Sequence, residues 1–322
     1  MRWRVRAVGL AGTGALAALL VVLLGSPSSA RAADCGGNVP CHCGDTVNRS
    51  TTLTADLGVC SGLGLRLRSG IVLNCANHTI TGNTSSTARY GILLDVATRA
   101  VVKNCRVTGF RKGIRVYRGQ GNQILGSETF ANHDYGIELA GSVSNVVANN
   151  SSYDNGDEGI HVGTGSHDNA IRSNTVTHNK NENIYVLSSN RCRITDNTAT
   201  RTDSAAIFLK HAHDTYVANN TVVNGRIHAR GDAVDNTFED NSLRGNGYFF
   251  EAYQDASGVW TYPHNNSVIG GKVENTTTCL RFAGAYDNLV DQLRLDDECQ
   301  VTMWPLGGRE PTGNVVHTLP LQ

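Results

Sequence analysis

Four residues in the middle of the chain recur at a nearly constant step and carry side chains suited to proton transfer. Arg115, Glu138, His161 and Tyr185 are separated by 23, 23 and 24 residues. An imidazole is a general base near neutral pH, a phenol can donate a proton, and a guanidinium can neutralise a carboxylate. Together these groups would suit removal of the C5 proton of a uronate, which requires that the neighbouring carboxylate be neutralised.

This chemistry gives each candidate catalytic residue a role. His161 would be the base, Arg115 or Lys210 would neutralise the carboxylate, and Tyr185 would donate a proton. Donation to the leaving oxygen describes a lyase, and donation to the opposite face of the sugar ring describes a C5-epimerase. The candidate substrate-binding residues lie in the same column, beside it, in the turns before it or in a later loop, and are Tyr117, Asp134, Glu138, Asp157, Glu158, Trp260 and Tyr262.

Two alternatives use the same surface differently. Asp134 and Asp157 would lie on neighbouring turns of the repeat, near the short separation of the carboxylate pair in a retaining glycoside hydrolase. Arg115 and Glu138 would otherwise be a stacked pair of opposite charges that stabilises the fold. In that case the surface would bind a glycan, or serve as a scaffold, without turning a substrate over.

Clusters of histidine and cysteine do not lead us to predict a metal site. His42 lies between Cys41 and Cys43, and His211 and His213 lie close together. Disulfide pairing and a strand-to-turn junction explain these groups without a metal. A role in copper handling would want clusters of methionine, and the chain has only 2 methionines. We predict no resident cofactor and leave assistance by Ca²⁺ open.

The element that must position these residues is a repeated short strand. Six segments have an apolar residue at their second and fourth positions and begin 22, 23, 23, 24 and 23 residues apart. This alternation is typical of a strand with one buried face, so the third position of each segment should point to solvent. The segments begin at Gly91, Gly113, Gly136, Gly159, Asn183 and Ala206, and their third positions are Leu93, Arg115, Glu138, His161, Tyr185 and Phe208.

A second apolar series keeps the same step and precedes a column of polar turn residues. Stacked coils would place these turn amides roughly 4.8 Å apart, where each can bond its neighbour. A short strand such as Thr175–Thr177 follows each turn, which makes three strands per coil of about 23 residues. The apolar series is Ile124, Val147, Ile171, Ile194, Val217 and Phe238, and the turn column is Ser127, Asn150, Asn174, Asn197, Asn220 and Asn241, continued backwards by Asn104 and Asn74.

This repeat predicts an all-β, single-stranded right-handed parallel β-helix. A leucine-rich repeat or a Ca²⁺-binding nonapeptide roll would need motifs that the chain lacks. From about Leu65 to Val316, and most clearly from Tyr90 to Asn246, the chain resembles the β-helix repeat proteins of the pectate-lyase-like superfamily. It resembles distantly their polysaccharide lyases and mannuronan C5-epimerases, which implies a polysaccharide partner. The motifs of the pectate lyases and polygalacturonases are absent. The signature loops of the epimerases and polysaccharide lyases have no residue-by-residue match here, so no catalytic residue is carried over from them.

The ends of the chain predict export and a stapled cap. Residues 1–32 read as a signal peptide, with three arginines before an apolar run from Val8 to Leu24 and an A-x-A pattern ending at Ala32. We expect a cap at 33–64, a β-helix domain at 65–322 and a loop excursion near 253–265. An exported chain can oxidise its cysteines, and the predicted disulfide residues are Cys35, Cys41, Cys43, Cys60, Cys279 and Cys299.

Composition narrows the partners further. The chain has 28 Lys+Arg and 28 Asp+Glu, which argues against a nucleic-acid binder that relies on a general basic field. No stretch after the signal is long and apolar enough for a membrane helix. The 9 cysteines are an odd number, so intramolecular pairing leaves at least one thiol. We therefore expect a secreted monomer that acts on a polysaccharide.

Overall fold

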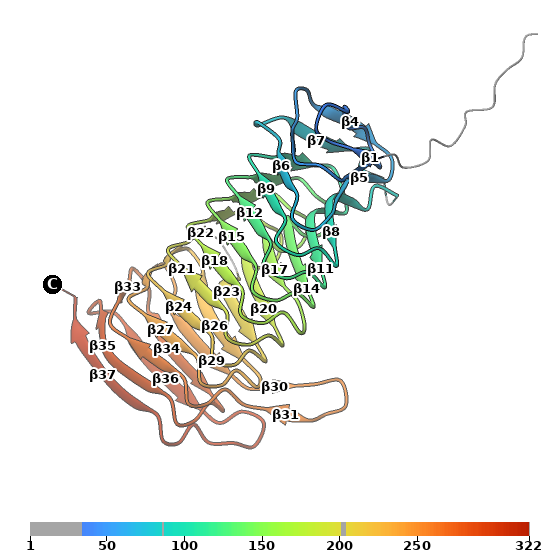
Figure 1. Cartoon of the computed structure of the whole chain (residues 1–322). Coiled ribbons are helices and arrows are strands. Elements are labelled where there is room, and N and C mark those ends of the chain that lie inside the picture. The colour runs from blue at the N-terminus through green and yellow to red at the C-terminus, as the bar shows by residue number, and fades with distance from the viewer. Residues whose placement is uncertain (1–33, 86, 201–203, 322) are drawn as a thin grey trace, which may run out of the picture. The chain divides into compact units, whose positions relative to one another are not determined.

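The predicted solenoid is present. The structure, a computed structural model, describes residues 34–85, 87–200 and 204–321. These residues form an all-β parallel β-helix of about 12 coils (Figure 1), and no helix occurs among them. Every coil pairs with the next through parallel strands. The repeat length in the sequence is therefore the number of residues in one coil.

The first face is a 13-stranded parallel sheet in which successive coils contribute successive strands. Its strands are β1 (Asp34–Cys35), β2 (Thr46–Val47), β5 (Leu63–Leu67), β8 (Tyr90–Asp95), β11 (Lys112–Tyr117), β14 (Ile137–Ala140), β17 (Ile160–Val162), β20 (Ile184–Leu187), β23 (Ala205–Lys210), β26 (Arg226–Arg230), β29 (Tyr248–Glu251), β34 (Thr278–Ala283) and β36 (Gln300–Trp304).

The second and third faces are joined into one 22-stranded sheet by β35 (Leu289–Leu295), which pairs with strands of both. The second face also contains β3 (Thr51–Thr52), β6 (Val72–Asn74), β9 (Val101–Lys103), β12 (Gln123–Leu125), β15 (Val146–Ala148), β18 (Ala170–Arg172), β21 (Arg193–Thr195), β24 (Tyr216–Ala218), β27 (Thr237–Glu239), β32 (Ser267–Ile269) and β37 (Val315–Pro320). The third face contains β4 (Leu57–Cys60), β7 (Thr79–Gly82), β10 (Arg106–Thr108), β13 (Glu128–Phe130), β16 (Ser151–Tyr153), β19 (Thr175–Thr177), β22 (Thr198–Thr200), β25 (Thr221–Val223), β28 (Ser242–Arg244) and β33 (Lys272–Glu274).

Aliphatic columns fill the interior of the solenoid. On the first face Ile114, Ile137, Ile160 and Ile184 stack in register and are fully buried. The glycine before Ile137 has a packing reason, because a Cβ on Gly136 would lie 2.7 Å from the carbonyl oxygen of Gly159. The coils therefore approach more closely there than any larger residue would allow.

The predicted asparagine ladder is confirmed. Asn150 Nδ2 donates to Asn174 Oδ1 at 3.0 Å, and Asn174 Nδ2 donates to Asn197 Oδ1 at 2.9 Å. Each amide also donates to a carbonyl of the preceding coil, as Asn174 does to Val147 O. Sequence analysis missed two similar ladders, which contain Asn122, Asn145 and Asn169 in one column and Asn132, Asn155 and Asn179 in the other.

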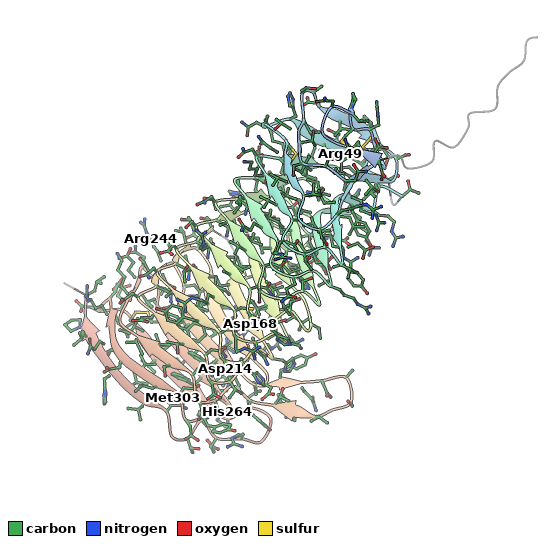
Figure 2. All side chains as sticks on the ribbon, viewed as in Figure 1. Arg49, Asp168, Asp214, Arg244, His264 and Met303 are labelled. Carbon is green, nitrogen blue, oxygen red and sulfur yellow. A yellow bond between two sulfur atoms is a disulfide. The ribbon has the colours of Figure 1, made fainter. Side chains whose placement is uncertain are left out.

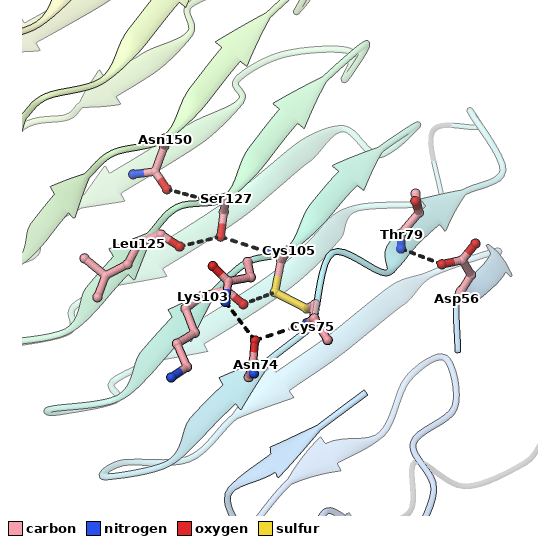
Figure 3. Close-up of a disulfide and its surroundings, with 11 residues drawn as sticks. Asp56, Asn74, Cys75, Thr79, Lys103, Cys105, Leu125, Ser127 and Asn150 are labelled. Atoms are coloured by element: carbon pink, nitrogen blue, oxygen red, sulfur yellow. Dashed lines mark hydrogen bonds between the residues drawn. A yellow bond between two sulfur atoms is a disulfide. The ribbon is translucent and has the colours of Figure 1, made fainter. Parts of the chain in front are cut away.

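The backward continuation of this ladder was wrong by one residue. Cys105, not Asn104, lies in register with Ser127, and its N–H donates to Ser127 Oγ at 3.1 Å. Cys105 forms a disulfide with Cys75 (Figure 3). A covalent link thus replaces the stacked amide where the ladder begins, and Asn104 turns outward to donate to Asn74 Oδ1.

All six predicted disulfide residues are paired. The bonds are Cys35–Cys41, Cys43–Cys60 and Cys279–Cys299, in addition to Cys75–Cys105. Because Cys41 and Cys43 belong to different disulfides, their thiolates do not combine with His42 as metal ligands. Cys192 is a buried free thiol, which confirms the unpaired cysteine expected from the odd number.

The expected segment boundaries are only partly visible. The excursion near 253–265 is a hairpin of β30 (Tyr253–Gln254) and β31 (Trp260–Thr261), the antiparallel pair that projects from the solenoid in Figure 1. Parallel pairing continues from β2 to β5 through the expected end of the cap, so that boundary stays a prediction. The signal peptide lies outside the described residues. Within the described ranges there is no helix with the length and apolar character that crossing a membrane requires.

Candidate functional site

The four residues that motivated the proton-transfer hypothesis share one ridge on the first face. Their strands pair in direct succession, so Arg115, Glu138, His161 and Tyr185 are neighbours along the solenoid axis. We call the series of aligned residues from Arg66 to Thr302 the outer column. It contains Arg66, Leu93, Arg115, Glu138, His161, Tyr185, Phe208, His228, Phe249, Arg281 and Thr302.

The outer column lies on the outer side of the sheet, as expected, but several of its side chains are nearly buried. Glu138, His161 and Phe208 are only 5%, 8% and 8% exposed. Glu138 and His161 are flanked by a neighbouring column on the same face, which contains Tyr90, Lys112, Tyr135, Glu158 and Glu182. Phe208 is stacked between Tyr185 and His228. The site is therefore a partly desolvated surface, where charges interact more strongly than in water.

Glu138 is the centre of a tight ion-pair cluster. Lys112 Nζ lies 2.6 Å from Glu138 Oε1, and Arg115 Nε lies 2.8 Å from Glu138 Oε2. Arg115 also donates to the hydroxyl of Tyr90 at 2.7 Å and lies 4.8 Å from the ring centroid of Tyr117. These contacts confirm the cross-strand pairing of Arg115 with Glu138 and engage both cations with this carboxylate.

His161 is held on two sides and left open on a third. Its ring stacks on Tyr135 with centroids 4.4 Å apart, and Nδ1 lies 3.5 Å from Glu158 Oε2. A Cβ on Gly163 would lie 3.1 Å from His161 Nε2, so the glycine keeps that side of the imidazole uncrowded. The carboxylate beside Nδ1 favours a proton there, which leaves the Nε2 lone pair free to accept one.

Two phenols border His161 and retain their protons. Tyr185 meets His161 edge-on, with ring centroids 5.4 Å apart, and stacks on Phe208 on its other side. Burial raises the pKa of Tyr185, and the nearby carboxylates of Glu182 and Glu158 raise it further. Burial also raises the pKa of Tyr135. Both hydroxyls therefore keep their protons at neutral pH and can donate hydrogen bonds.

Lys210 is not brought next to His161. It follows Phe208 on β23, two coils beyond His161, and its Nζ lies 3.8 Å from the ring centroid of Tyr253. The nearest cations on the other side, Lys112 and Arg115, are paired with Glu138. Lys210 therefore lies two coils away from His161, and its neutralising role stays a prediction.

The two aspartates of the hydrolase alternative do lie on neighbouring coils. The N–H of Asp157 donates to the carbonyl of Asp134 at 3.0 Å. Arg111 Nε donates to Asp134 Oδ2 at 2.7 Å, and the side-chain amide of Asn181 donates to Asp157 Oδ1. Asp134 is thus ion-paired with Arg111 and Asp157 is hydrogen-bonded by Asn181, so both carboxylates already have partners at the rim of the first face.

The aromatic residues of the excursion lie against the C-terminal turn. The hydroxyl of Tyr262 donates to the carbonyl of Gly307 at 2.8 Å, and a Cβ on Gly307 would meet the Trp260 ring at 2.4 Å. Arg309 covers Tyr262, with 5.4 Å from Cζ to the ring centroid. These contacts pin the excursion to later coils, so Trp260 and Tyr262 are not adjacent to His161.

Sequence analysis missed the C-terminal part of the outer column. His228 stacks on Phe208 with centroids 4.7 Å apart, is 3% exposed, and has Nε2 3.2 Å from Glu251 Oε2. Burial lowers the pKa of His228 to about 4 even though Glu251 opposes the shift. The regular repeat did not reveal these residues, because the step from Phe208 to His228 is 20 residues and the later steps are more irregular.

No metal centre is evident in this part of the protein. Among the residues that the structure describes, no group of three or more His, Cys, Asp or Glu is arranged to hold a metal ion. His213 Nε2 lies 3.2 Å from Asp232 Oδ2, and His211 accepts a hydrogen bond from the N–H of Asp232. The Ca²⁺ question is therefore one for measurement.

Several solved structures have a similar fold. The tailspike protein gp208 of Dettilon has a TM-score of 0.58 at 15% identity, over 84% of this chain and 59% of that chain. The A-module of the mannuronan C-5 epimerase AlgE4 of Azotobacter vinelandii has a TM-score of 0.53 at 14% identity, over 89% of this chain and 91% of that chain. The periplasmic alginate epimerase AlgG has a TM-score of 0.52 at 14% identity, over 78% and 68%.

At these identities the likeness concerns the fold. This chain spans less than two thirds of the tailspike chain. No curated protein matches it in sequence. A family model described as the right handed beta helix region matches residues 69–222 and 165–295, which together cover more than half of the chain. The chain therefore belongs to the right-handed β-helix family.

Proposed function

We propose that the protein is a secreted enzyme that removes the C5 proton from a uronate of an acidic polysaccharide, as a lyase or a C5-epimerase. The observation that carries the proposal is the environment of His161. An imidazole lies between a carboxylate, Glu158, and two protonated phenols, Tyr135 and Tyr185, with its Nε2 side left open by Gly163.

The arrangement supplies both halves of a proton transfer. His161 Nε2 would take the proton from C5, while Glu158 stabilises the imidazolium that forms. The distance of 3.5 Å between Nδ1 and Glu158 is long for a hydrogen bond, and catalytic contacts of this kind commonly shorten when substrate binds. Tyr185 would deliver a proton from its phenol.

The destination of the proton from Tyr185 separates the two reactions. In a lyase the bond from C4 to its oxygen breaks, a double bond forms between C4 and C5, and the phenol protonates the departing oxygen. In an epimerase the phenol protonates C5 from the face opposite His161 and no bond of the chain breaks. Either step leaves Tyr185 as a phenolate. The protonated His161 can return a proton to this phenolate through solvent.

The choice of an acidic polysaccharide has two supports. The first face carries cations on both sides of His161, with Lys112 and Arg115 toward the N-terminus and Lys210 and Arg230 toward the C-terminus. In addition, two of the solved structures with this fold are named as epimerases of mannuronan and alginate. A polymer laid along the solenoid would meet both basic regions.

Secretion is supported by the cysteines. Four disulfides form within residues 35–299, and disulfides persist in oxidising compartments. An N-terminal signal for export would deliver the chain to such a compartment. The same location would give the enzyme access to polysaccharides outside the membrane.

A second candidate function is glycan binding without turnover. Its specific support is the cluster around Glu138, where both nearby cations are already paired and the side chains of Glu138 and Lys112 are 7% and 13% exposed. A surface whose charges are satisfied internally can present aromatic and polar groups to a sugar chain without performing chemistry on it. Binding that survives loss of both His161 and Arg115, with no turnover by the wild type, would favour this candidate.

The test is a direct assay on a panel of acidic polysaccharides. Alginate, polygalacturonate and glycosaminoglycans are incubated with the purified protein in D₂O, with Ca²⁺ and with a chelator. Unsaturated uronate is followed by ultraviolet absorbance, and exchange at C5 is followed by NMR. We expect one polymer to give a signal that His161→Gln lowers at least about a hundredfold.

The matched control is His317→Gln, because His317 is 71% exposed in its side chain and lies on β37 of the second face. This control should keep full activity. Silence of the wild type in both assays on every polymer would rule out the enzyme. Equal losses in the two histidine variants would show that the effect is not local to the first face.

A further inference from the structure

We infer that the first face holds a second site, separate from His161, that binds an anionic group of the glycan through Arg226, Arg230 and Arg281. The chemical class of the ligand is a carboxylate or sulfate ester carried on a sugar. The inference uses the proposed function only to say that the anion belongs to the same polymer.

The three arginines come from two strands of the first face, β26 and β34, with β29 between them. Arg226 and Arg230 lie two residues to either side of His228 on β26, so the alternation of the strand directs all three outward. Arg281 lies in the outer column on β34, with Phe249 between it and His228. The site is thus centred on three successive coils of the first face.

Aromatic rings hold the guanidinium groups in place. The Cζ atoms of Arg226 and Arg281 lie 5.1 and 5.2 Å from the ring centroid of Phe249. Arg281 also lies 4.3 Å from the ring of Trp304, and Arg230 lies 5.1 Å from the ring of Tyr253. Stacking on a ring engages the face of a guanidinium and leaves its N–H edge available for an acceptor.

One donor of each guanidinium group lacks an acceptor in the part of the chain that the structure describes. The Nε atoms of Arg226, Arg230 and Arg281 are all buried without a hydrogen-bond partner there. A buried donor without a partner is costly, and clustered cations repel one another. An anion with several oxygens would satisfy these donors and reduce the repulsion.

The balance of charges around the three arginines also favours an anionic ligand. Burial lowers the pKa of Arg226, and Arg281 and Arg230 lower it further, while Glu251 and Glu182 oppose them. Glu251 is drawn first toward His228, whose hydrogen bond is the main cause of its lowered pKa. Two carboxylates therefore face three guanidinium groups and leave a net positive charge for a ligand.

The position of the site suits a polymer that also reaches His161. His228 is three coils from His161 along the outer column, which is about 14 Å at the spacing of paired strands. A planar guanidinium binds a carboxylate or sulfate through two parallel hydrogen bonds. The second site would anchor an anionic sugar several units away from the reacting one.

Binding of small anions to the disulfide-bonded protein tests the inference. Sodium sulfate and a galacturonate trisaccharide are titrated separately at low ionic strength by calorimetry. We expect the double variant R226Q/R281Q to bind both probes at least about tenfold more weakly than the wild type. Circular dichroism and thermal unfolding confirm that the variant is folded, and R281K provides a milder change that keeps the charge.

The matched control is R244Q, because Arg244 is exposed on β28 of the third face (Figure 2). This control should bind like the wild type. Wild-type protein that binds neither probe, or a control that weakens as much as the double variant, would overturn the inference. Binding of sulfate without the trisaccharide would overturn the assignment to a glycan.

The test separates this inference from the proposed enzyme. His161→Gln should abolish turnover and keep the affinity for both probes. If R226Q/R281Q loses affinity while no polymer is ever turned over, the anion site stands and the proposed enzyme fails. If polymers are turned over with an unchanged KM in R226Q/R281Q, the enzyme stands and the anion site fails.

Discussion

Replacing one amide in the middle of the asparagine ladder should destabilise several coils at once. Asn174 is 1% exposed and takes part in four side-chain hydrogen bonds. It donates to Val147 O and Asn197 Oδ1, and it accepts from the backbone N–H and the side-chain amide of Asn150. Asn174→Ala removes all four and leaves buried partners on both neighbouring coils.

The size of the effect follows from these bonds. Each neutral hydrogen bond contributes about 0.5–1.5 kcal/mol net, and a buried group left without a partner costs about 1–3 kcal/mol. Four lost bonds at about 1 kcal/mol each predict that Asn174→Ala lowers the free energy of unfolding by about 4 kcal/mol. The loss per hydrogen bond should lie toward the upper end of the range for neutral bonds, because the buried groups left without partners cannot bond to water.

The asparagine column contains a natural comparison, because one of its positions is a serine. Ser127 accepts from the N–H of Cys105 and donates to Leu125 O, each at 3.1 Å. Asn174→Ser should therefore keep about half of the bonds and lose about 2 kcal/mol. Asn181→Ala, which removes one exposed contact to Asp157, should lose less than about 1 kcal/mol.

The assay is equilibrium unfolding in urea with the disulfides intact, followed by circular dichroism. If Asn174→Ala and Asn174→Ser lost the same free energy, the side-chain amide would not be the stabilising element. A loss below about 1 kcal/mol for Asn174→Ala would refute the additive use of the four bonds.

Three further measurements bear on the site and the ends of the solenoid. Burial lowers the pKa of His228 to about 4, so as the pH falls below about 6.5 the unfolded chain takes up a proton before the folded chain does. The free energy of unfolding should therefore fall by about 3 kcal/mol between pH 6.5 and 4. His228→Phe should remove most of this pH dependence in urea unfolding measured over the same pH range. Replacing Cys75 and Cys105 with serine opens a covalent loop with a sequence separation of 30 residues and should cost about 3–4 kcal/mol in thermal or urea unfolding. Tyr185→Phe should lower kcat on the responsive polymer by at least about a hundredfold while the Kd stays within about threefold, and an unchanged kcat would remove Tyr185 from the mechanism.

The repeat could be predicted from sequence because each coil obeys the same local constraints. A buried aliphatic such as Ile160 is required at every turn of the solenoid, and a buried turn requires an amide such as Asn174 to bond its backbone. Such requirements recur at one step along the chain and are visible as a period. The error at Asn104 arose where a disulfide at Cys105 meets the same requirement with a different residue.

The environment of the outer column could not be predicted in the same way. The burial of His161 depends on Tyr135 and Glu158, which lie on two coils and in a flanking column. Their packing follows from side-chain directions that a period does not encode. His228 was missed for another reason, since the coils after Phe208 change length and the hairpin at 253–261 interrupts them.

The contrast between the inner and outer columns is the physical argument for placing function on the first face. Inside the solenoid, successive coils repeat isoleucine, which fills the interior without burying a polar group. Outside, the same strands present Arg115, Glu138, His161 and Tyr185, each of a different chemistry and each partly desolvated. Apolar residues of similar size would stabilise such positions at least as well as charged ones. The outer column thus brings unlike groups together at fixed intervals, which is the arrangement that the proposed proton transfer on an extended polymer would use.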